Sequence, residues 1–290
     1  MNMKKTLRLL LILALTCALA LSSSITSSAL FGGGNRITHT EELAGGGPYT
    51  LIIDHINTFN FRLWSWSVLS FSLGDGPIRT VTIDESAPLG VTLVGGHRTI
   101  DRLQVTVDET ARTIHIGMRN RLTFYRFALR GLNIIVGGVE VDSIRFSNSG
   151  RAELTYADAS PEEFSLNLSG RITADIGFSN HLSNINVDLR SNAVATLTGS
   201  ADSATYNIAG FSRLHAFDFP VTNVNARLTG TSYLEQFFAR DGRLTAYVAN
   251  SSWIYYNFER VYLNEPLAPP VIEANLAQVG RIRRWFVRPE

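Results

Sequence analysis

Cysteine is almost missing from this chain of 290 residues, because Cys17 is its only one. Cys17 lies inside an apolar run near the N-terminus, and removal of that run would leave a chain without a thiol. Such a chain has no disulfide, no thiolate zinc site and no cysteine nucleophile. A strong basic excess is missing as well, since the formal net charge is +1. Nucleic-acid binding depends on such an excess, so no nucleic-acid partner is expected.

Residues 1–29 have the layout of a signal peptide. The basic start MNMKKTLR is followed by the apolar run Leu9–Leu21, and Ser27 and Ala29 are small residues at the positions that precede a cut. We therefore expect cleavage after Ala29 and export to the periplasm, the outer surface or the medium. An uncleaved anchor is the alternative, but the run is shorter than the ~20 residues of a spanning helix. No later stretch is long and apolar enough to span a membrane as a helix.

Cys17 permits a second interpretation of this segment, in which it is the lipid-modified residue of a bacterial lipoprotein. Thr16, directly before it, is a poor substitute for the Gly or Ala usual at that place. The apolar run also continues beyond Cys17. The sequence favours cleavage after Ala29 and leaves lipidation open.

The rest of the chain divides by pattern into four segments. Residues 30–48 contain FGGGN and AGGGP and predict a flexible, Gly-rich lead-in. Residues 49–140 hold irregular strand patterns such as IRTVTI, VTLV, RLQVTV, TIHI and LNIIV, which we expect to start or cap a stack. Residues 141–263 carry repeats. Residues 264–290 form a C-terminal cap or tail.

A seven-residue pattern recurs at intervals of about twenty, as in IAGFSRL (208–214) and LTGTSYL (228–234). Before each corner stands a segment that alternates apolar and polar residues, which is typical of a strand with one buried face. Four residues after the corner stands an apolar residue in every copy. The corner positions are Gly150, Gly170, Ser191, Gly210, Gly230 and Asn250.

This interval predicts an all-β fold, a single-stranded parallel β-solenoid or β-helix with about 20 residues per coil. Equivalent strands then pair in parallel at about 4.8 Å, and their apolar residues merge into one core. Gly, Ser and Asn at the corners suit a left-handed backbone. An antiparallel sandwich is the alternative, but it gives no reason for the same columns to recur every twenty residues.

The C-terminal segment leaves the repeat. Its Pro pair, Pro269-Pro270, breaks the strand pattern, and we expect a short helix or strand that lies across the last coil. A second interpretation is a patch for anionic surfaces, formed by Arg281, Arg283, Arg284 and Arg288.

With the repeats aligned, the chain resembles the head GIN domain of putative autotransporter adhesins, a family of exported bacterial proteins. The residues that carry the resemblance are the units LSGRI, IAGFSRL, LTGTSYL and VANSSWIYY, the lead-in RLQVTVDETARTIHI, and the ending IYYNF…NEP. They span about Thr80 to Pro266. Single Gly, Ser or Asn corners stand where the family has doubled Gly-Ser-Gly corners. The resemblance implies a β-helix-like fold and an adhesive role, and it transfers no catalytic residue.

Catalytic and metal sites find little support. The six histidines are not paired at short spacing with one another, so no metal and no cofactor are expected. A carbohydrate-active β-helix enzyme is the alternative function, but Asp175, Asp188 and Asp218 fall in different columns rather than in a converging pair. Ser212, His215 and Asp218 suggest a triad, yet they lie too close together in sequence to converge.

One outward column does suggest binding. Arg213, Tyr233 and Trp253 each stand three residues after a corner, and Tyr255 lies beside them. Stacked on successive coils, they predict an aromatic and cationic strip for a glycan, cell-wall or protein ligand. The other interpretation is that the C-terminal tail covers Trp253 and Tyr255. The sequence thus favours an exported, non-catalytic, adhesin-like binding module of the cell envelope or surface.

Overall fold

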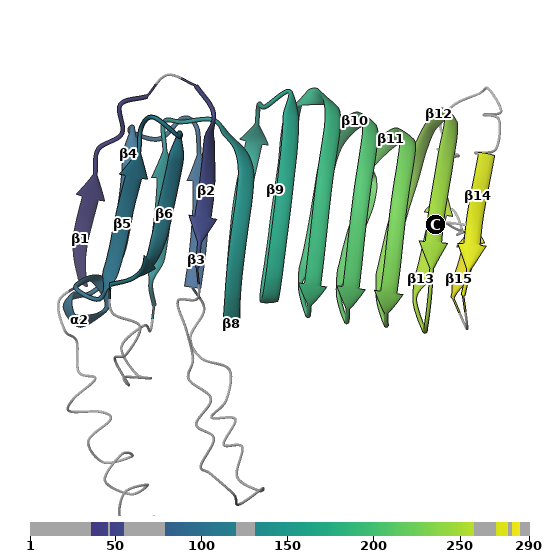
Figure 1. Cartoon of the computed structure of the whole chain (residues 1–290). Coiled ribbons are helices and arrows are strands. Elements are labelled where there is room, and N and C mark those ends of the chain that lie inside the picture. The colour runs from purple at the N-terminus through teal and green to yellow at the C-terminus, as the bar shows by residue number, and fades with distance from the viewer. Residues whose placement is uncertain are drawn as a thin grey trace, which may run out of the picture.

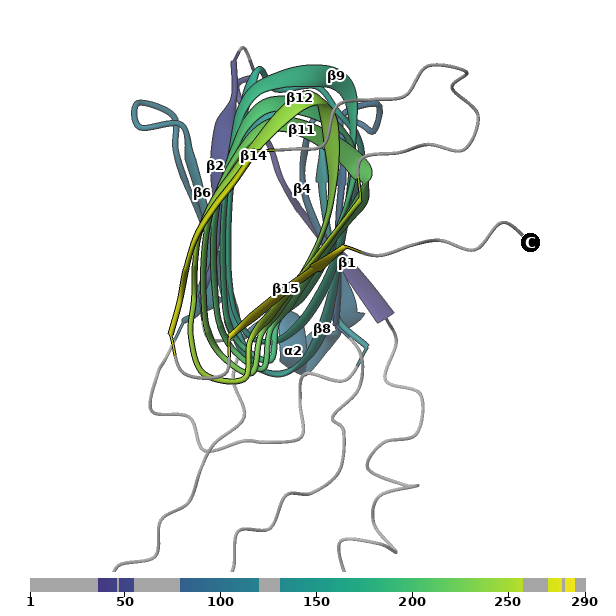
Figure 2. The ribbon, with the colours of Figure 1, turned by 90° about the vertical axis from the view of Figure 1, so that its right-hand side faces the viewer.

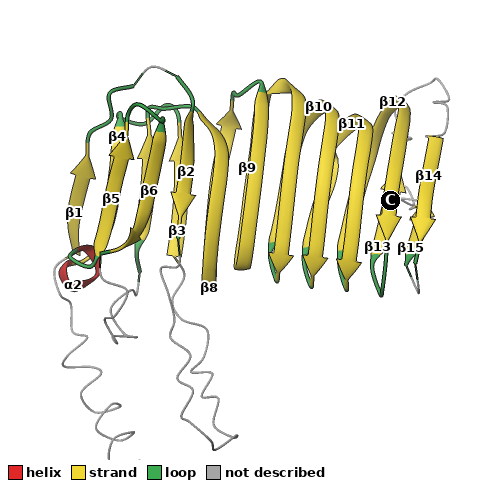
Figure 3. Ribbon diagram, in the orientation of Figure 1, coloured by secondary structure: helices red, strands yellow, loops and turns green. Residues whose placement is uncertain are grey.

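The computed structural model describes residues 36–45, 47–54, 79–119, 131–257, 271–277 and 280–284. The expected signal peptide, with Cys17, lies outside these ranges, as does Arg288. The described chain consists mainly of strands, with one four-residue helix, α2 (His97–Ile100) (Figure 3). The prediction of an all-β fold is confirmed. The strands are β1 (Arg36–Glu41), β2 (Tyr49–Ile53), β3 (Arg79–Asp84), β4 (Gly90–Gly96), β5 (Leu103–Asp108), β6 (Thr113–Met118), β7 (Asn133–Gly137), β8 (Val141–Ala159), β9 (Glu163–Ser191), β10 (Val194–Gly210), β11 (Arg213–Gly230), β12 (Tyr233–Val248), β13 (Trp253–Asn257), β14 (Val271–Leu276) and β15 (Arg281–Arg284).

Strands β8 to β12 lie side by side, and each pairs in parallel with the next (Figure 1). In this register Ile208 lies beside Leu228 and Leu228 beside Val248, so these partners are 20 residues apart. Viewed along the stack, the turns of the chain superpose as a flattened ring with two long walls (Figure 2). We call the wall that contains β14 the first wall and the wall that contains β15 the second wall.

The N-terminal strands extend the stack with both kinds of pairing. β2 and β3 each pair in parallel with β8, whereas β1 with β4, β4 with β7, and β5 with β6 pair antiparallel. The sheet as a whole is therefore mixed, and a parallel arrangement describes only part of it. A turn of four residues joins β5 to β6, and so short a connection can join only antiparallel neighbours. Asp108 Oδ1 closes this turn by accepting the N–H groups of Thr110 and Ala111 at 3.0 and 2.9 Å.

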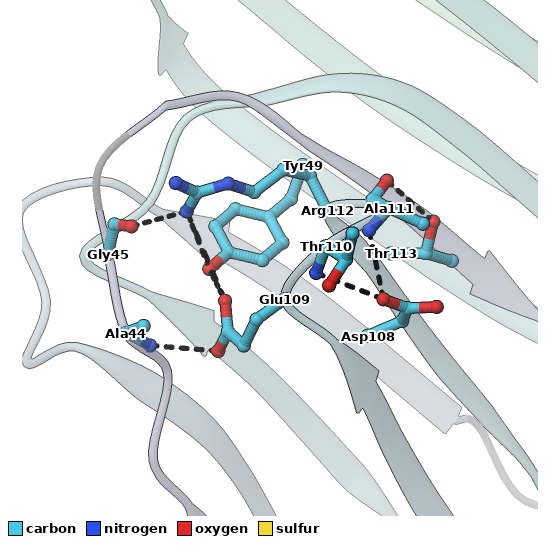
Figure 4. Close-up of polar contacts among 9 residues, drawn as sticks. All are labelled: Ala44, Gly45, Tyr49, Asp108, Glu109, Thr110, Ala111, Arg112 and Thr113. Atoms are coloured by element: carbon cyan, nitrogen blue, oxygen red, sulfur yellow. Dashed lines mark hydrogen bonds and ion pairs between the residues drawn. The ribbon is translucent and has the colours of Figure 1, made fainter.

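The predicted flexible lead-in is in part a strand, because β1 lies within residues 30–48. The lead-in is also tied to the β5–β6 turn (Figure 4). Glu109 accepts the Ala44 N–H at 2.9 Å and the hydroxyl of Tyr49, and Arg112 donates to the carbonyl of Gly45. Burial raises the pKa of the Tyr49 phenol, and the hydrogen bond from Tyr49 lowers the pKa of Glu109. These contacts hold the chain against the start of the stack.

The corners have the backbone that their residue types suggest. Gly170, Ser191, Gly210, Gly230 and Asn250 all have positive φ. Gly150 does not pair with Gly170 as the interval of twenty predicts, because Asn148 pairs with Gly170 and the register shifts before Arg151. A bulge therefore takes Gly150 out of the column to which its sequence assigns it.

Inward side chains form the core in columns. Leu214, Leu234 and Ile254 are register partners and are fully buried, and burying each such side chain contributes about 1.5–3 kcal/mol. Aromatic rings form a second row inside the stack, in which Phe178 lies 5.1 Å from Phe164 and 5.7 Å from Phe219, centroid to centroid. These columns keep the two walls rigid.

The C-terminal strands differ from the prediction that the segment leaves the stack. β14 pairs in parallel with β12, and β15 pairs in parallel with β13 (Figure 2). In this register Ile272 lies beside Leu244 and Ile282 beside Ile254, so apolar residues continue the inward columns. β14 and β15 add one further turn to the stack instead of lying across its end.

Candidate binding surface

Two neighbouring columns of outward-facing side chains lie on the second wall, near the C-terminal end of the stack. Their members come from β11, β12, β13 and β15 and are adjacent in register. We call this surface the strip. The first column is Arg213, Tyr233, Trp253 and Arg281, and the second is His215, Glu235, Tyr255 and Arg283.

Strand alternation places these side chains outside. Leu214 separates Arg213 from His215 and is fully buried, so its two neighbours face the opposite side of the sheet. Leu234 and Ile254 do the same on the next two strands. The strip is therefore held by a packed core directly beneath it.

The aromatic rings and the guanidinium groups of the strip are in contact. The rings of Trp253 and Tyr255 are stacked, with centroids 5.7 Å apart and an interplanar angle of 5°. The guanidinium carbons of Arg281 and Arg283 lie 4.7 and 5.0 Å from the centroid of the Trp253 ring. Because the aromatic face carries partial negative charge, these contacts hold the arginine side chains over the ring.

The same arrangement recurs one strand earlier, where the Arg213 guanidinium carbon lies 5.3 Å from the centroid of the Tyr233 ring. Beside it, the His215 Nδ1–H donates to Glu235 Oε2 at 2.5 Å. A hollow of about 380 Å³ opens between these residues, and Tyr255 forms its remaining side.

The structure brings together the four predicted binding residues Arg213, Tyr233, Trp253 and Tyr255. Part of the tail does cover Trp253, as the alternative interpretation expected, because β15 lies beside β13 and its arginines stand over the Trp253 ring. Trp253 and Tyr255 are both half-buried. Two arginines of the predicted basic patch thus belong to the strip. Arg284 does not, since it alternates with Arg283 and pairs with Tyr256.

His215 and Glu235 were not predicted to act together, although the sequence holds a signal for the pair. Each stands five residues after a corner glycine, Gly210 or Gly230, so the interval of twenty makes them neighbours. The place of Arg281 and Arg283 has no such signal, because the segment between β13 and β15 is longer than that interval.

The triad suggested by Ser212, His215 and Asp218 does not form. Ser212 is fully buried and donates to the Ala209 carbonyl at 2.8 Å, while His215 is bonded to Glu235. Asp218 is exposed and pairs in register with Thr198.

The acidic candidates do not converge either. Asp175 lies on the second wall beside Thr196, whereas Asp188 lies on the first wall and is bonded to Arg190 at 2.9 and 2.6 Å. A pair of carboxylates on one face, as glycoside hydrolysis requires, is therefore not made by these residues.

A Ser–His–Asp chain of hydrogen bonds does occur elsewhere, where the sequence did not suggest one. His181 Nδ1 lies 2.8 Å from Ser200 Oγ, and His181 Nε2 lies 2.9 Å from Asp202 Oδ1. The side chains of His181 and Asp202 are 54% and 66% exposed, so water surrounds the group. A nucleophile works in a pocket with oxyanion donors, and neither described hollow includes these residues.

A second hollow of about 590 Å³ lies on the second wall near β3 and β8, and Asp84, Glu85 and Asp158 are among its lining residues. Glu85 Oε1 accepts the Tyr156 hydroxyl at 2.5 Å, and Oε2 accepts the Ser160 hydroxyl at 2.6 Å. The Glu85 carboxylate is thus engaged in holding β3 to the end of β8.

In the ranges that the structure describes, no group of three or more His, Cys, Asp or Glu residues could hold a metal ion. No helix within those ranges is long and apolar enough to cross a membrane.

Solved structures of similar fold come from species of Bacteroides and Parabacteroides. A "putative adhesin" from Bacteroides fragilis is 14% identical with a TM-score of 0.63, and the alignment covers 87% of this chain and 97% of that one. A "putative lipid binding protein" and a "putative adhesin" from Parabacteroides distasonis are each 15% identical, with TM-scores of 0.56 and 0.54. Each of these two alignments covers 88% of this chain and 98% of the other. At such identities the likeness concerns the fold.

Curated proteins give no match. A protein family does match, over residues 76–257, and its description is "Putative auto-transporter adhesin, head GIN domain". The matched range runs from just before β3 to the end of β13 and holds the repeated corners and most of the strip. This chain belongs to that family of head GIN domains.

Proposed function

We propose that this chain is an exported, adhesin-like binding module without a catalytic centre, built as a parallel β-solenoid of about 20 residues per coil. The pairing of Ile208 with Leu228 and of Leu228 with Val248 supports the solenoid description. Family membership supports the adhesin-like role. Export rests on the layout of residues 1–29, with cleavage after Ala29.

The observation that carries the binding role is the strip itself. Arg213, Tyr233, Trp253 and Tyr255 stand in register on a wall with a packed core, next to the hollow of about 380 Å³. Planar rings held on a rigid surface lose little conformational entropy when a ligand lies against them. An extended glycan, cell-wall polymer or peptide fits such a row, because its units can follow successive strands.

The test is retention of the chain on immobilised glycans and cell-wall material. Trp253→Ala and Tyr233→Ala are expected to weaken retention while thermal unfolding remains cooperative. Tyr247→Ala is the matched control, since Tyr247 is a tyrosine on the first wall with Arg227 over its ring. Retention that is the same for all three variants and the parent chain removes the strip as the binding site.

The enzyme alternative is tested with the same preparation. The assay measures whether the chain depolymerises a polysaccharide. If it does, and if mutation of Asp175, Asp188 or Asp218 alone abolishes that activity, the chain is a carbohydrate-active enzyme and the binding proposal is wrong. The separation of Asp175 and Asp188 onto opposite walls favours the binding module.

A further inference from the structure

The arginines of the strip lie over aromatic rings, as Arg227 also does over Tyr247, whereas several other arginines lie beside carboxylates. Arg190 is bonded to Asp188 through two hydrogen bonds, and Arg151 and Arg112 lie within 4.0 Å of Glu153 and Glu109. Within the described residues, the guanidinium groups of Arg213, Arg281 and Arg283 contact aromatic rings and form no ion pair. All three side chains are exposed. Their hydrogen-bond donors are therefore directed to solvent, over or beside a ring.

The only carboxylate in the two columns is already engaged. Glu235 accepts the Nδ1–H of His215 at 2.5 Å, and both side chains are partly buried. The strip thus has three arginines against one carboxylate that has its own partner. This local positive charge is not a property of the whole chain, whose net charge is +1.

The residue types in these two columns change from the earlier strands of the stack to the later ones. At earlier strands the positions that correspond to the strip are Glu153, Thr173 and Val194 in the first column, and Asp175 and Thr196 in the second. Parallel strands are about 4.8 Å apart, so Asp175 lies about 10 Å from the start of the strip at His215. Within these two columns, cationic and aromatic residues are therefore concentrated on the last four strands.

A ligand for this surface needs flat apolar faces for the rings and anionic groups for the guanidinium groups. A planar guanidinium matches a carboxylate through two parallel hydrogen bonds. Pyranose rings have an apolar C–H face, and in uronic acids the same ring carries a carboxylate. We infer that the strip takes a carboxylate-bearing glycan, a conclusion that rests on the proposed binding function and names its ligand class.

An anionic membrane surface fits the strip less well. Membrane-bound surfaces insert several apolar side chains beside their cations. The large apolar side chains that are exposed in the described residues are Leu89, Phe211, Val271 and Leu276, and of these only Phe211 stands within two residues of a strand of the strip. A row of rings and arginines along successive strands suits a polymer chain.

The experiment compares two polysaccharides that have the same sugar chain and differ only in charge. Polygalacturonate carries a carboxylate on every unit, and its full methyl ester has lost those charges. Binding of the chain to each is measured by biolayer interferometry at two salt concentrations. We expect the methyl ester to bind about tenfold more weakly or worse, because charge-assisted hydrogen bonds are lost.

Variants connect the effect to the strip. Arg213→Gln alone and Arg281→Gln with Arg283→Gln should each weaken polygalacturonate binding about tenfold and reduce its salt dependence. Arg227→Gln is the matched control, since it removes an arginine stacked over a tyrosine on the first wall and should leave binding unchanged. Arg213 lies on β11, which has a paired strand on each side, whereas β15 is the terminal strand. The Arg213 variant therefore stays informative if changes in β15 impair folding.

Each other outcome has a definite meaning. Equal binding of both polymers, lost in Trp253→Ala, overturns the carboxylate inference and leaves the proposed function intact. Binding to vesicles of phosphatidylglycerol and phosphatidylcholine, with no binding to either polymer, also overturns the inference in favour of a membrane ligand. If the chain binds no carbohydrate, cell-wall material, peptide or vesicle, the proposed function fails together with the inference.

Discussion

Arg281 and Trp253 are register partners on β15 and β13, and the guanidinium carbon of Arg281 lies 4.7 Å from the centroid of the Trp253 ring. The contact links the last described strand to β13, its neighbour in the second wall. It also places a guanidinium group beside the aromatic side chains that the sequence repeat predicts to form a binding strip. The pair thus connects the end of the fold with the candidate binding surface.

This contact should be measurable as a coupling energy. In a double-mutant cycle with Arg281→Ala and Trp253→Leu, we expect a coupling of about 0.5–1 kcal/mol in unfolding free energy, as for an exposed cation–π pair. A cycle that combines Trp253→Leu with Arg227→Ala should give no coupling, because Arg227 lies on the opposite wall over Tyr247. Equal coupling in both cycles would show that the effect is not specific to this contact.

The inward columns were predictable from the sequence because residues that are twenty apart become register partners on neighbouring strands. Leu214, Leu234 and Ile254 are partners in the structure for this reason. The interval fails where the chain gains or loses a residue. At Gly150 a bulge shifts the register, and a bulge of this kind has no clear mark in a single sequence.

The terminal strands show a second limit. β15 has four residues, RIRR, and only Ile282 continues the inward column beside Ile254. A longer connection precedes it, so the interval no longer indicates which residue is its partner. The strip residues on β11, β12 and β13 were therefore predictable from the columns, while Arg281 and Arg283, which complete the strip, depend on a non-local pairing.

The buried row of aromatic rings should dominate stability. Phe219 is fully buried, and its ring lies 5.7 Å from that of Phe178. Phe219→Ala is expected to destabilise the chain by about 3–5 kcal/mol, and Phe219→Leu by clearly less because most of the volume is kept. Urea unfolding followed by circular dichroism measures both. A loss below about 1 kcal/mol for the alanine variant would contradict the packing described here.

The corner at Gly230 should tolerate no side chain. Its φ is 87°, and a Cβ there would lie 2.7 Å from the carbonyl oxygen of Gly210 on the neighbouring turn. We expect Gly230→Ala to lower the unfolding free energy by about 1–3 kcal/mol. Asn250→Gly is the opposite change at an equivalent corner, with φ of 58°, and should be close to neutral. Similar losses for the two variants in urea unfolding would argue against backbone strain as the cause.

Two glutamates near the start of the stack should respond to pH in opposite directions. Burial raises the pKa of Glu140, and the nearby Glu85 and Asp142 raise it further, whereas the hydrogen bond from Tyr49 lowers the pKa of Glu109. A raised pKa in the folded state means that stability falls as the pH rises from the unfolded pKa of 4.5 through the folded one. A lowered pKa means that stability is present above 4.5 and is lost as the pH falls through the folded pKa.

Glutamine at either position removes the titration and separates the two effects. At pH 7, Glu140→Gln should be more stable than the parent chain and Glu109→Gln less stable, when thermal unfolding is followed at constant ionic strength. Both differences should shrink as the pH is lowered towards 4, because Glu140 becomes neutral in the folded chain, while Glu109 begins to take up its proton in the unfolded chain. If Glu140→Gln is destabilising at pH 7, the carboxylate has a favourable partner in the folded chain, and burial does not determine its charge.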